Sequence, residues 1–221
     1  MVNNITILGF GSQAKTWASN LKDSGFEVTI LLRKESKSIK MAELEGHRVI
    51  SMPCSKNIDL GKYIAILTPD HTHYEILKEL EKNIEKNTTI IFAHGFGQLK
   101  HNFSKKFPQL NFTLLAPKAI ASEMRELYKQ GKSFPGAISL QYSNKKNDNE
   151  IYLRHIALKL GMSRPTTVTF EEETICDLFS EQSLLCSLIP YGIRYAFEAL
   201  RKRGIPAEMA FNECLFESKL I

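Results

Sequence analysis

The stretch ITILGFGSQAKTWA, Ile5 to Ala18, decides the fold of this chain. It begins with a short apolar run typical of a buried strand, and it ends in a segment with helical periodicity. Between them, Gly9, Gly11 and Ala14 form a G-x-G-x-x-A arrangement. The first glycine permits a tight turn, the second lets a pyrophosphate approach the backbone, and the alanine allows close helix packing. The stretch therefore predicts a strand, a phosphate-binding loop and a helix whose N-terminus faces the phosphates.

The sequence after this stretch continues to alternate short apolar runs with helical patterns. Such an alternation is typical of a parallel sheet covered by helices. Further strands are expected over 27–32, 63–67, 88–93, 112–116, 136–140 and 166–168, and helices over 13–23, 38–45, 72–85 and 149–160. The predicted fold is α/β: a Rossmann-like, doubly wound, mostly parallel sheet.

After Phe170 the sequence offers helical periodicity and no strand candidate. We therefore expect two domains, a dinucleotide-binding domain over residues 1–170 and the start of an all-helical domain over residues 171–221. The segment FEEETICDLFSEQ, which opens the second domain, is expected to form a buried helix. Its first three acids are expected to be solvated and to favour the helix N-terminus through the helix dipole; they are Glu171, Glu172 and Glu173.

Composition excludes several classes of protein. The net charge of +5 is mild, and no basic run interleaved with aromatic residues suggests nucleic-acid binding. An anionic small ligand would account for the basic excess equally well. No segment has the 18 or so uninterrupted apolar residues of a membrane span. The cysteines show no C-x-x-C spacing, so we interpret them as free thiols in a cytoplasmic protein; they are Cys54, Cys176, Cys186 and Cys214.

The end of the second predicted strand, LLRKESKSIK, indicates which dinucleotide binds. A site that selects NAD usually places an acid there to accept hydrogen bonds from the ribose hydroxyls. Here Arg33 stands at the strand end, with Ser36 and Ser38 close behind. A guanidinium and hydroxyls suit a 2′-phosphate, which favours NADPH. Glu35 is an acid and argues against NADPH. The alternative interpretation of the whole stretch is a solvated charged loop that binds no cofactor.

Two pairs of acids stand one helical turn apart, Asp177 with Glu181 and Glu213 with Glu217. Like charges at this spacing oppose each other by roughly 0.2–0.5 kcal/mol on an exposed helix, so a cation is expected between them. Four carboxylates suit Mg²⁺, and a two-metal centre could polarise a ketone while it stabilises a neighbouring alkoxide. The alternative is an ordinary solvated helix face.

These segments together resemble a known family. GFGSQ, the RKxSKS loop, LTPD, FAHGF, APKA, FEEETxxDLFxEQxxLC and the terminal ECLxExKLI are similar, in that order, to the acetohydroxy acid isomeroreductases, also called ketol-acid reductoisomerases. The resemblance covers essentially the whole chain. It implies Mg²⁺-dependent isomerisation of a 2-acetohydroxy acid by an alkyl shift, followed by NADPH-dependent reduction to a 2,3-dihydroxy acid in branched-chain amino acid biosynthesis.

The resemblance also implies roles for single residues. The two acid pairs match the metal-site carboxylates, and in the short form of the family the second pair comes from the partner subunit, so a homodimer with a shared site is expected. His94 matches the catalytic histidine and Lys118 a lysine near the metals. Without the family, a strand cap and a solvated loop residue would be the ordinary interpretations of these two. The residues that match cofactor contacts are Gly9, Phe10, Gly11, Ser12, Gln13, Arg33, Ser36, Ser38 and Asp70.

The chain departs from the family's pattern in three places. GQLK directly follows FAHGF, which shortens a loop beside the nicotinamide, and APKAIA carries Ile120 and Ala121 where the family has proline and glycine. The family's helical domain continues beyond the point that corresponds to Ile221, so this chain is interpreted as a fragment or a truncated product. Its last apolar residues are expected to need a partner or to aggregate. The alternatives are a catalytically silent NADP-binding relative, or another two-domain NADP-dependent dehydrogenase that uses Lys118 as its acid.

Overall fold

The computed structural model describes residues 3–53, 59–144 and 146–220. The chain divides into two compact units, Met1–Glu173 and Thr174–Ile221. No helix in the described part of the chain is long and apolar enough to cross a membrane. Cys176, Cys186 and Cys214 are free thiols, whereas Cys54 lies outside the described residues.

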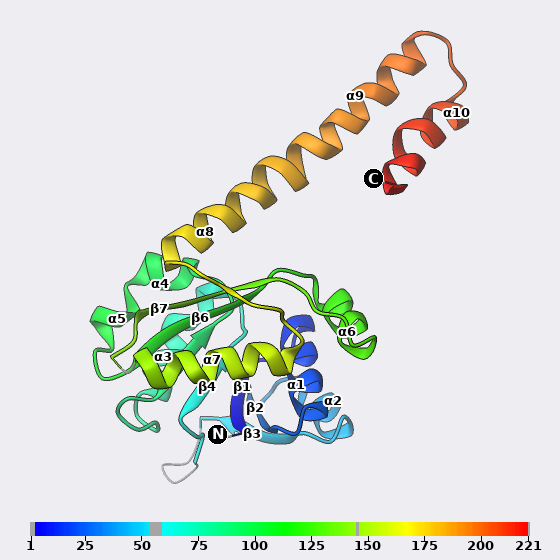
Figure 1. The fold of residues 1–221 in the computed structure, drawn as a ribbon. Coiled ribbons are helices and arrows are strands. Elements are labelled where there is room, and N and C mark those ends of the chain that lie inside the picture. The colour runs from blue at the N-terminus through cyan, green and yellow to red at the C-terminus, as the bar shows by residue number, and fades with distance from the viewer. Residues whose placement is uncertain (1–2, 54–58, 145, 221) are drawn as a thin grey trace. The chain divides into compact units, whose positions relative to one another are not determined.

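The first unit is built on one sheet, which has eight strands within the described residues (Figure 1). The strand order is β3-β2-β1-β4-β5-β6-β7-β8, and every neighbouring pair is parallel except β6 with β7. The order reverses between β1 and β4, and dinucleotides bind at such a switch point, outside the carboxyl ends of the strands. The strands are β1 Asn4–Leu8, β2 Glu27–Arg33, β3 Arg48–Met52, β4 Tyr63–Ile66, β5 Thr89–Phe92, β6 Asn111–Pro117, β7 Gly136–Tyr142 and β8 Thr166–Thr167.

Helices cover both faces of this sheet and enclose two apolar cores. Successive strand residues point to opposite faces, so Ile7 belongs to one core and Leu8 to the other. Side chains from α1, α2, α6 and α7 fill the first core, and those from α3 and α5 fill the second. The helices are α1 Ser12–Asp23, α2 Ile39–Leu44, α3 His73–Leu80, α4 Phe96–His101, α5 Phe103–Lys106, α6 Ala121–Lys129 and α7 Lys146–Leu160.

The predicted fold class is confirmed, but several elements were missed. The edge strand β3 is short and alternates buried with exposed residues, so it lacks a continuous apolar run. Helix α6 is mostly polar, and Met124 is its buried side chain. Helices α4 and α5 are short and follow each other closely. Weak or brief apolar patterns therefore account for the omissions.

The second unit is helical, and its first helix begins inside the first unit. Helix α8, Phe170–Phe179, starts with a capping box: the Glu172 N–H donates to Thr169 Oγ1 at 3.0 Å, and the Thr169 N–H donates to Glu172 Oε2 at 2.8 Å. A π-helical stretch and α9 continue α8, and α10 then folds back to contact α9 (Figure 1). The elements after α8 are π-helix Ser180–Leu188, α9 Ile189–Lys202, α10 Ala207–Phe211, π-helix Asn212–Phe216 and 3₁₀ helix Glu217–Leu220.

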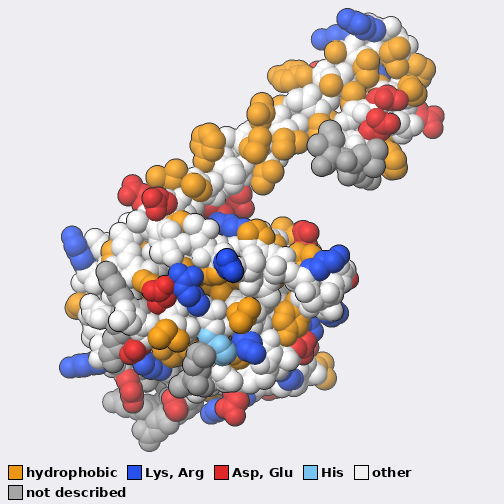
Figure 2. All heavy atoms as spheres, viewed as in Figure 1, with side chains coloured by type: hydrophobic (Ala, Val, Ile, Leu, Met, Phe, Trp, Pro, Cys, Tyr) orange, Lys and Arg blue, Asp and Glu red, His pale blue; other side chains and the backbone are white. Residues whose placement is uncertain are grey.

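The expected buried helix over FEEETICDLFSEQ is wrong for this single chain beyond its first turns. Phe179 is 69% exposed, and Leu184 and Leu185, just beyond the segment, are 43% and 55% exposed. Figure 2 shows hydrophobic side chains along much of the second unit. The apolar spacing identified a face to be covered, but α10 and the short helices that follow it leave that face in solvent.

Candidate active site

The glycine loop between β1 and α1 has the backbone that a phosphate site requires. Gly9 has a φ of +105°, and a Cβ there would lie 3.1 Å from the Leu67 carbonyl oxygen. A side chain at this position would be strained in conformation and crowded. Gly11 caps α1, and nothing lies within 4 Å of the Cβ it lacks. The loop is therefore tight on its inner side and open in front of the helix N-terminus, where backbone N–H groups attract an anion.

A cavity of about 580 Å³ opens at this loop. Its volume lies within the range of small-ligand pockets, roughly 300–1,000 Å³. Six of the nine predicted cofactor residues line it: Gly9, Phe10, Gly11, Arg33, Ser36 and Ser38. The glycine loop and the end of β2 thus face one space, as a dinucleotide that spans both would require.

The other three predicted cofactor residues do not line the cavity. Ser12 is the exposed first residue of α1. The Gln13 Nε2 donates to the Ala119 carbonyl oxygen at 3.4 Å, while its buried Oε1 has no hydrogen-bond partner among the described residues. The Asp70 carboxylate lies 3.6 Å from His73 Nδ1. Their proposed contacts with cofactor stay predictions.

One wall of the cavity was missed from the sequence. It is formed by α3 and the residues just before it, and it includes two acids. The signal was available, because positions 72, 75, 76 and 79 follow helical spacing, opposite the buried residues 73, 77 and 80. This wall consists of Thr72, Glu75, Ile76 and Glu79.

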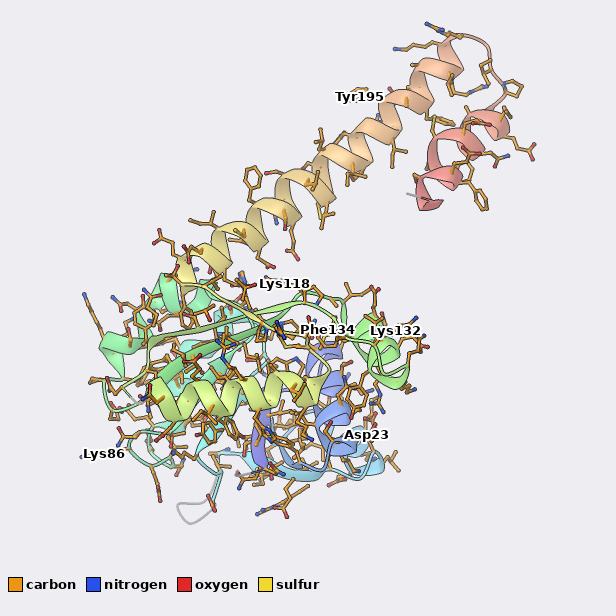
Figure 3. The ribbon with its side chains drawn as sticks, in the orientation of Figure 1. Asp23, Lys86, Lys118, Lys132, Phe134 and Tyr195 are labelled. Carbon is orange, nitrogen blue, oxygen red and sulfur yellow. The ribbon has the colours of Figure 1, made fainter. Side chains whose placement is uncertain are left out.

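The two predicted catalytic residues meet at a buried carboxylate. His94 follows β5 and Lys118 follows β6, so adjacent parallel strands deliver both to one edge of the sheet; Figure 3 labels Lys118. The Lys118 Nζ donates to Glu173 Oε1 at 2.8 Å, and His94 Nδ1 lies 3.2 Å from Glu173 Oε2. The Gly95 N–H also donates to Oε2, at 2.9 Å. The Glu173 side chain is 1% exposed, against 24% for His94 and 35% for Lys118.

Glu173 remains ionised in this environment. Burial alone would raise the pKa of its carboxyl group. Hydrogen bonds from His94 and Lys118 and the positive charge of Lys118 outweigh burial and hold that pKa below its usual value. The carboxylate can therefore orient both partners at neutral pH.

The expectation that all three acids at the start of α8 are solvated is wrong for Glu173. Glu171 is exposed as expected, and Glu172 belongs to the capping box. Glu173 turns into the first unit because Phe170, at 0% exposure, fixes the first turn of α8 in the core. The sequence did contain a signal for Glu173. It lies four residues before Asp177, which lies four residues before Glu181, so helical spacing places the three acids on one face.

The four predicted metal ligands lie in the second unit. Asp177 lies in the last turn of α8, and the others lie in π-helical or 3₁₀ stretches rather than in regular α-helix. Such irregular helix is frequent at functional sites. Among the described residues of one chain, no three of these carboxylates lie within 4.8 Å of one another. A single chain therefore does not assemble the predicted site; its members are Asp177, Glu181, Glu213 and Glu217.

Two family models match nearly the whole chain. The family model described as "Acetohydroxy acid isomeroreductase, NADPH-binding domain" matches residues 2–165, and "Ketol-acid reductoisomerase, C-terminal domain" matches residues 170–221. The chain belongs to the ketol-acid reductoisomerase family.

Individual relatives within this family are similar over nearly the whole chain. The "Ketol-acid reductoisomerase (NADP(+))" of Sulfurimonas denitrificans is 37% identical over 98% of this chain and 64% of its own length. That of Petrotoga mobilis is 36% identical over 98% of this chain and 66% of its own length. The chain thus spans slightly less than two thirds of the length of these curated relatives.

Solved structures extend the comparison to the fold. An NADH-preferring ketol-acid reductoisomerase from an uncultured archean is 29% identical, has a TM-score of 0.85, and aligns over 99% of this chain and 67% of its own. A semialdehyde dehydrogenase NAD-binding protein from Cupriavidus necator, 16% identical with a TM-score of 0.76, aligns over 100% of this chain and 82% of its own. The second likeness concerns the fold alone.

Proposed function

We propose that this chain, paired with a second copy, carries out the NADPH- and Mg²⁺-dependent isomerisation and reduction of 2-acetohydroxy acids to 2,3-dihydroxy acids. The observation that carries the proposal is the Glu173 cluster. It holds Lys118 at 2.8 Å and His94 at 3.2 Å, at the same carboxyl edge of the sheet as the glycine loop. A proton donor at the sheet edge where the dinucleotide is proposed to bind is what reduction of a ketone requires.

Each member of the cluster has a distinct role in this proposal. Glu173 positions the other two and accepts a hydrogen bond from the Lys118 Nζ. When a hydride reaches the carbonyl carbon, the oxygen gains negative charge, and Lys118 donates a proton to that oxygen. His94 is oriented through its Nδ1 contact with Glu173. Both Lys118 and His94 are partly exposed and therefore accessible to a substrate.

The cofactor proposed is NADPH. Arg33, Ser36 and Ser38 supply a guanidinium and two hydroxyls to one end of the cavity, which is the chemistry that a 2′-phosphate needs. The two curated relatives carry NADP(+) in their names. The nicotinamide end would face the edge where His94 and Lys118 lie.

The proposed metal ligands fit Mg²⁺ in their chemistry. Asp177, Glu181, Glu213 and Glu217 supply only carboxylate oxygens, the donor type that a hard cation prefers. When bound, the ions would polarise the substrate carbonyl and stabilise the neighbouring alkoxide. Because one chain does not gather the four carboxylates, we propose that each pair meets the other pair of a second copy. The exposed apolar side chains of the second unit support such a homodimer.

A second candidate is an NADP-binding relative without catalytic activity. The observation that favours it is the dispersal of the four metal-site carboxylates within one chain. This candidate keeps the nucleotide cavity and needs no metal.

One experiment separates the two candidates. The purified full chain is incubated with 2-acetolactate, NADPH and Mg²⁺, and NADPH oxidation is followed by absorbance. The proposed enzyme oxidises NADPH, and EDTA stops the reaction. Its Asp177→Asn variant loses activity while the dissociation constant for NADPH stays unchanged. A folded preparation that binds NADPH but shows no metal-dependent oxidation would exclude the enzyme and select the silent relative.

A further inference from the structure

The α3 wall of the nucleotide cavity carries two carboxylates that the proposed 2′-phosphate contacts do not use. Glu75 and Glu79 lie one helical turn apart and line the same cavity as Arg33. Ile76 lies between them in sequence and also faces the cavity, so this wall combines an apolar surface with two acids. A planar base can rest on the apolar surface while the acids meet polar groups at its rim.

Neither acid is neutralised by a neighbour. Among the described residues, no ion pair involves Glu75, Glu79 or Arg33. Within the described residues, the cavity therefore presents one guanidinium and two carboxylates that form no ion pair. Charges inside a partly enclosed cavity are screened less than charges on an open surface. Glu79 is half-buried and Glu75 is exposed, so the field of Glu79 is the less screened of the two.

These charges act in opposite directions on the two dinucleotides. A 2′-phosphate is attracted by Arg33 and repelled by both acids. A ribose without that phosphate offers hydroxyl donors, and a carboxylate accepts hydrogen bonds from such hydroxyls in NAD-selecting sites.

We propose that Glu79, assisted by Glu75, sets the nucleotide preference of this cavity by opposing Arg33. The acids weaken NADPH binding relative to NADH, so the chain prefers NADPH less strongly than Arg33, Ser36 and Ser38 alone would make it. This inference rests on the proposed dinucleotide-binding function and adds the residues that determine its specificity.

The test compares dissociation constants for NADPH and NADH, measured by fluorescence titration of the full chain. Glu79→Gln lowers the NADPH constant about three- to tenfold, as expected for one partly screened charge, and leaves the NADH constant equal or higher. Glu75→Gln has the same effect to a smaller extent, and the effect shrinks as salt is raised. The matched control is Glu85→Gln, which removes an exposed acid outside the cavity and changes neither constant.

The outcomes separate this inference from the proposed function. A folded wild-type chain that binds neither dinucleotide would overturn the proposed function itself. A wild-type chain that binds NADPH, but whose NADPH-to-NADH ratio changes less than twofold in both glutamate variants, would overturn only the role of the acids. Thermal unfolding of each variant verifies that the compared proteins are folded.

Discussion

The two units of this chain differ in how they cover their apolar side chains. In the first unit, Trp17 and Phe112 are completely buried, and two continuous cores fill both faces of the sheet. In the second unit, Phe179 and Tyr195 are 69% and 67% exposed, and Figure 3 labels Tyr195 on the second unit. The first unit therefore buries its large apolar side chains by itself, whereas the second leaves large apolar side chains exposed, which is typical of surfaces that bind a partner.

The same contrast applies to the acids along α8. Glu173, at the end of the first unit, is buried and paired with Lys118 and His94. Of the four predicted metal ligands in the second unit, no three lie within 4.8 Å of one another among the described residues of one chain. The residues proposed to bind the nucleotide thus lie around one cavity of a single chain, while we propose that the metal site forms only when two chains associate.

The largest expected effect tests this contrast in packing. Phe112→Ala should lower the free energy of unfolding by roughly 3–5 kcal/mol, because it removes a fully buried aromatic side chain. Tyr195→Ala should change it by less than about 0.5 kcal/mol, because the side chain is exposed. Urea unfolding followed by fluorescence measures both, since Trp17 is the only tryptophan and reports on the first unit. Equal effects of the two changes would contradict the contrast.

The next effect concerns the buried carboxylate. Glu173→Gln should destabilise the first unit by about 1–3 kcal/mol, because it leaves Lys118 without its charged acceptor. Glu171→Gln, two residues earlier in the same turn and exposed, is the matched control and should change stability by less than about 0.5 kcal/mol. Urea unfolding followed by Trp17 fluorescence measures both variants. Equal stabilities of Glu173→Gln and Glu171→Gln would show that Glu173 does not link the cluster.

The contribution of Glu173 should also depend on pH. Its pKa is lowered in the folded chain, so its stabilisation is fully present above the ordinary glutamate pKa of about 4.3. It diminishes as the pH falls below that value and disappears once the pH is below the folded pKa. The stability difference between wild type and Glu173→Gln should therefore be constant near neutral pH and vanish in acid. A difference that grows toward low pH would contradict the assigned ion pair.

The smallest effect on folding is expected from the surface of the second unit. Phe179→Asp should leave the unfolding of the first unit within about 0.5 kcal/mol of wild type, because Phe179 is exposed in the single chain. It should nevertheless shift the protein from dimer to monomer, because a charge disrupts an apolar interface. Analytical ultracentrifugation at several concentrations measures this shift. An unchanged mass would show that this surface is not the interface.

Much of the first unit could be predicted from the sequence because its signals are local. Continuous apolar runs mark β1, β2, β4, β5 and β6, and the spacing of Gly9 and Gly11 marks the loop. The strand β3 and the helix α6 could not be found in the same way, because few of their residues are buried. Local patterns thus identified the strands that form the centre of the sheet.

The candidate site was less predictable because its contacts join distant segments. Glu173 meets a lysine 55 residues earlier and a histidine 79 residues earlier, and a run of three glutamates does not indicate which one turns inward. For Phe179, the apolar spacing shows that a face needs cover but not which chain supplies it. The sequence therefore could not predict which distant residues pair with Glu173, or what covers the exposed apolar face at Phe179.

The central claim is that two copies share each metal site, and a mixing experiment tests it directly. Asp177→Asn and Glu217→Gln chains, each inactive alone, are unfolded together, refolded, and assayed for Mg²⁺-dependent NADPH oxidation with 2-acetolactate beside the wild type. A shared site predicts recovery to about a quarter of the wild-type rate, because about half of the dimers are hybrids and each hybrid keeps one intact site of two. A folded, dimeric mixture that stays inactive while the wild type is active would contradict the account.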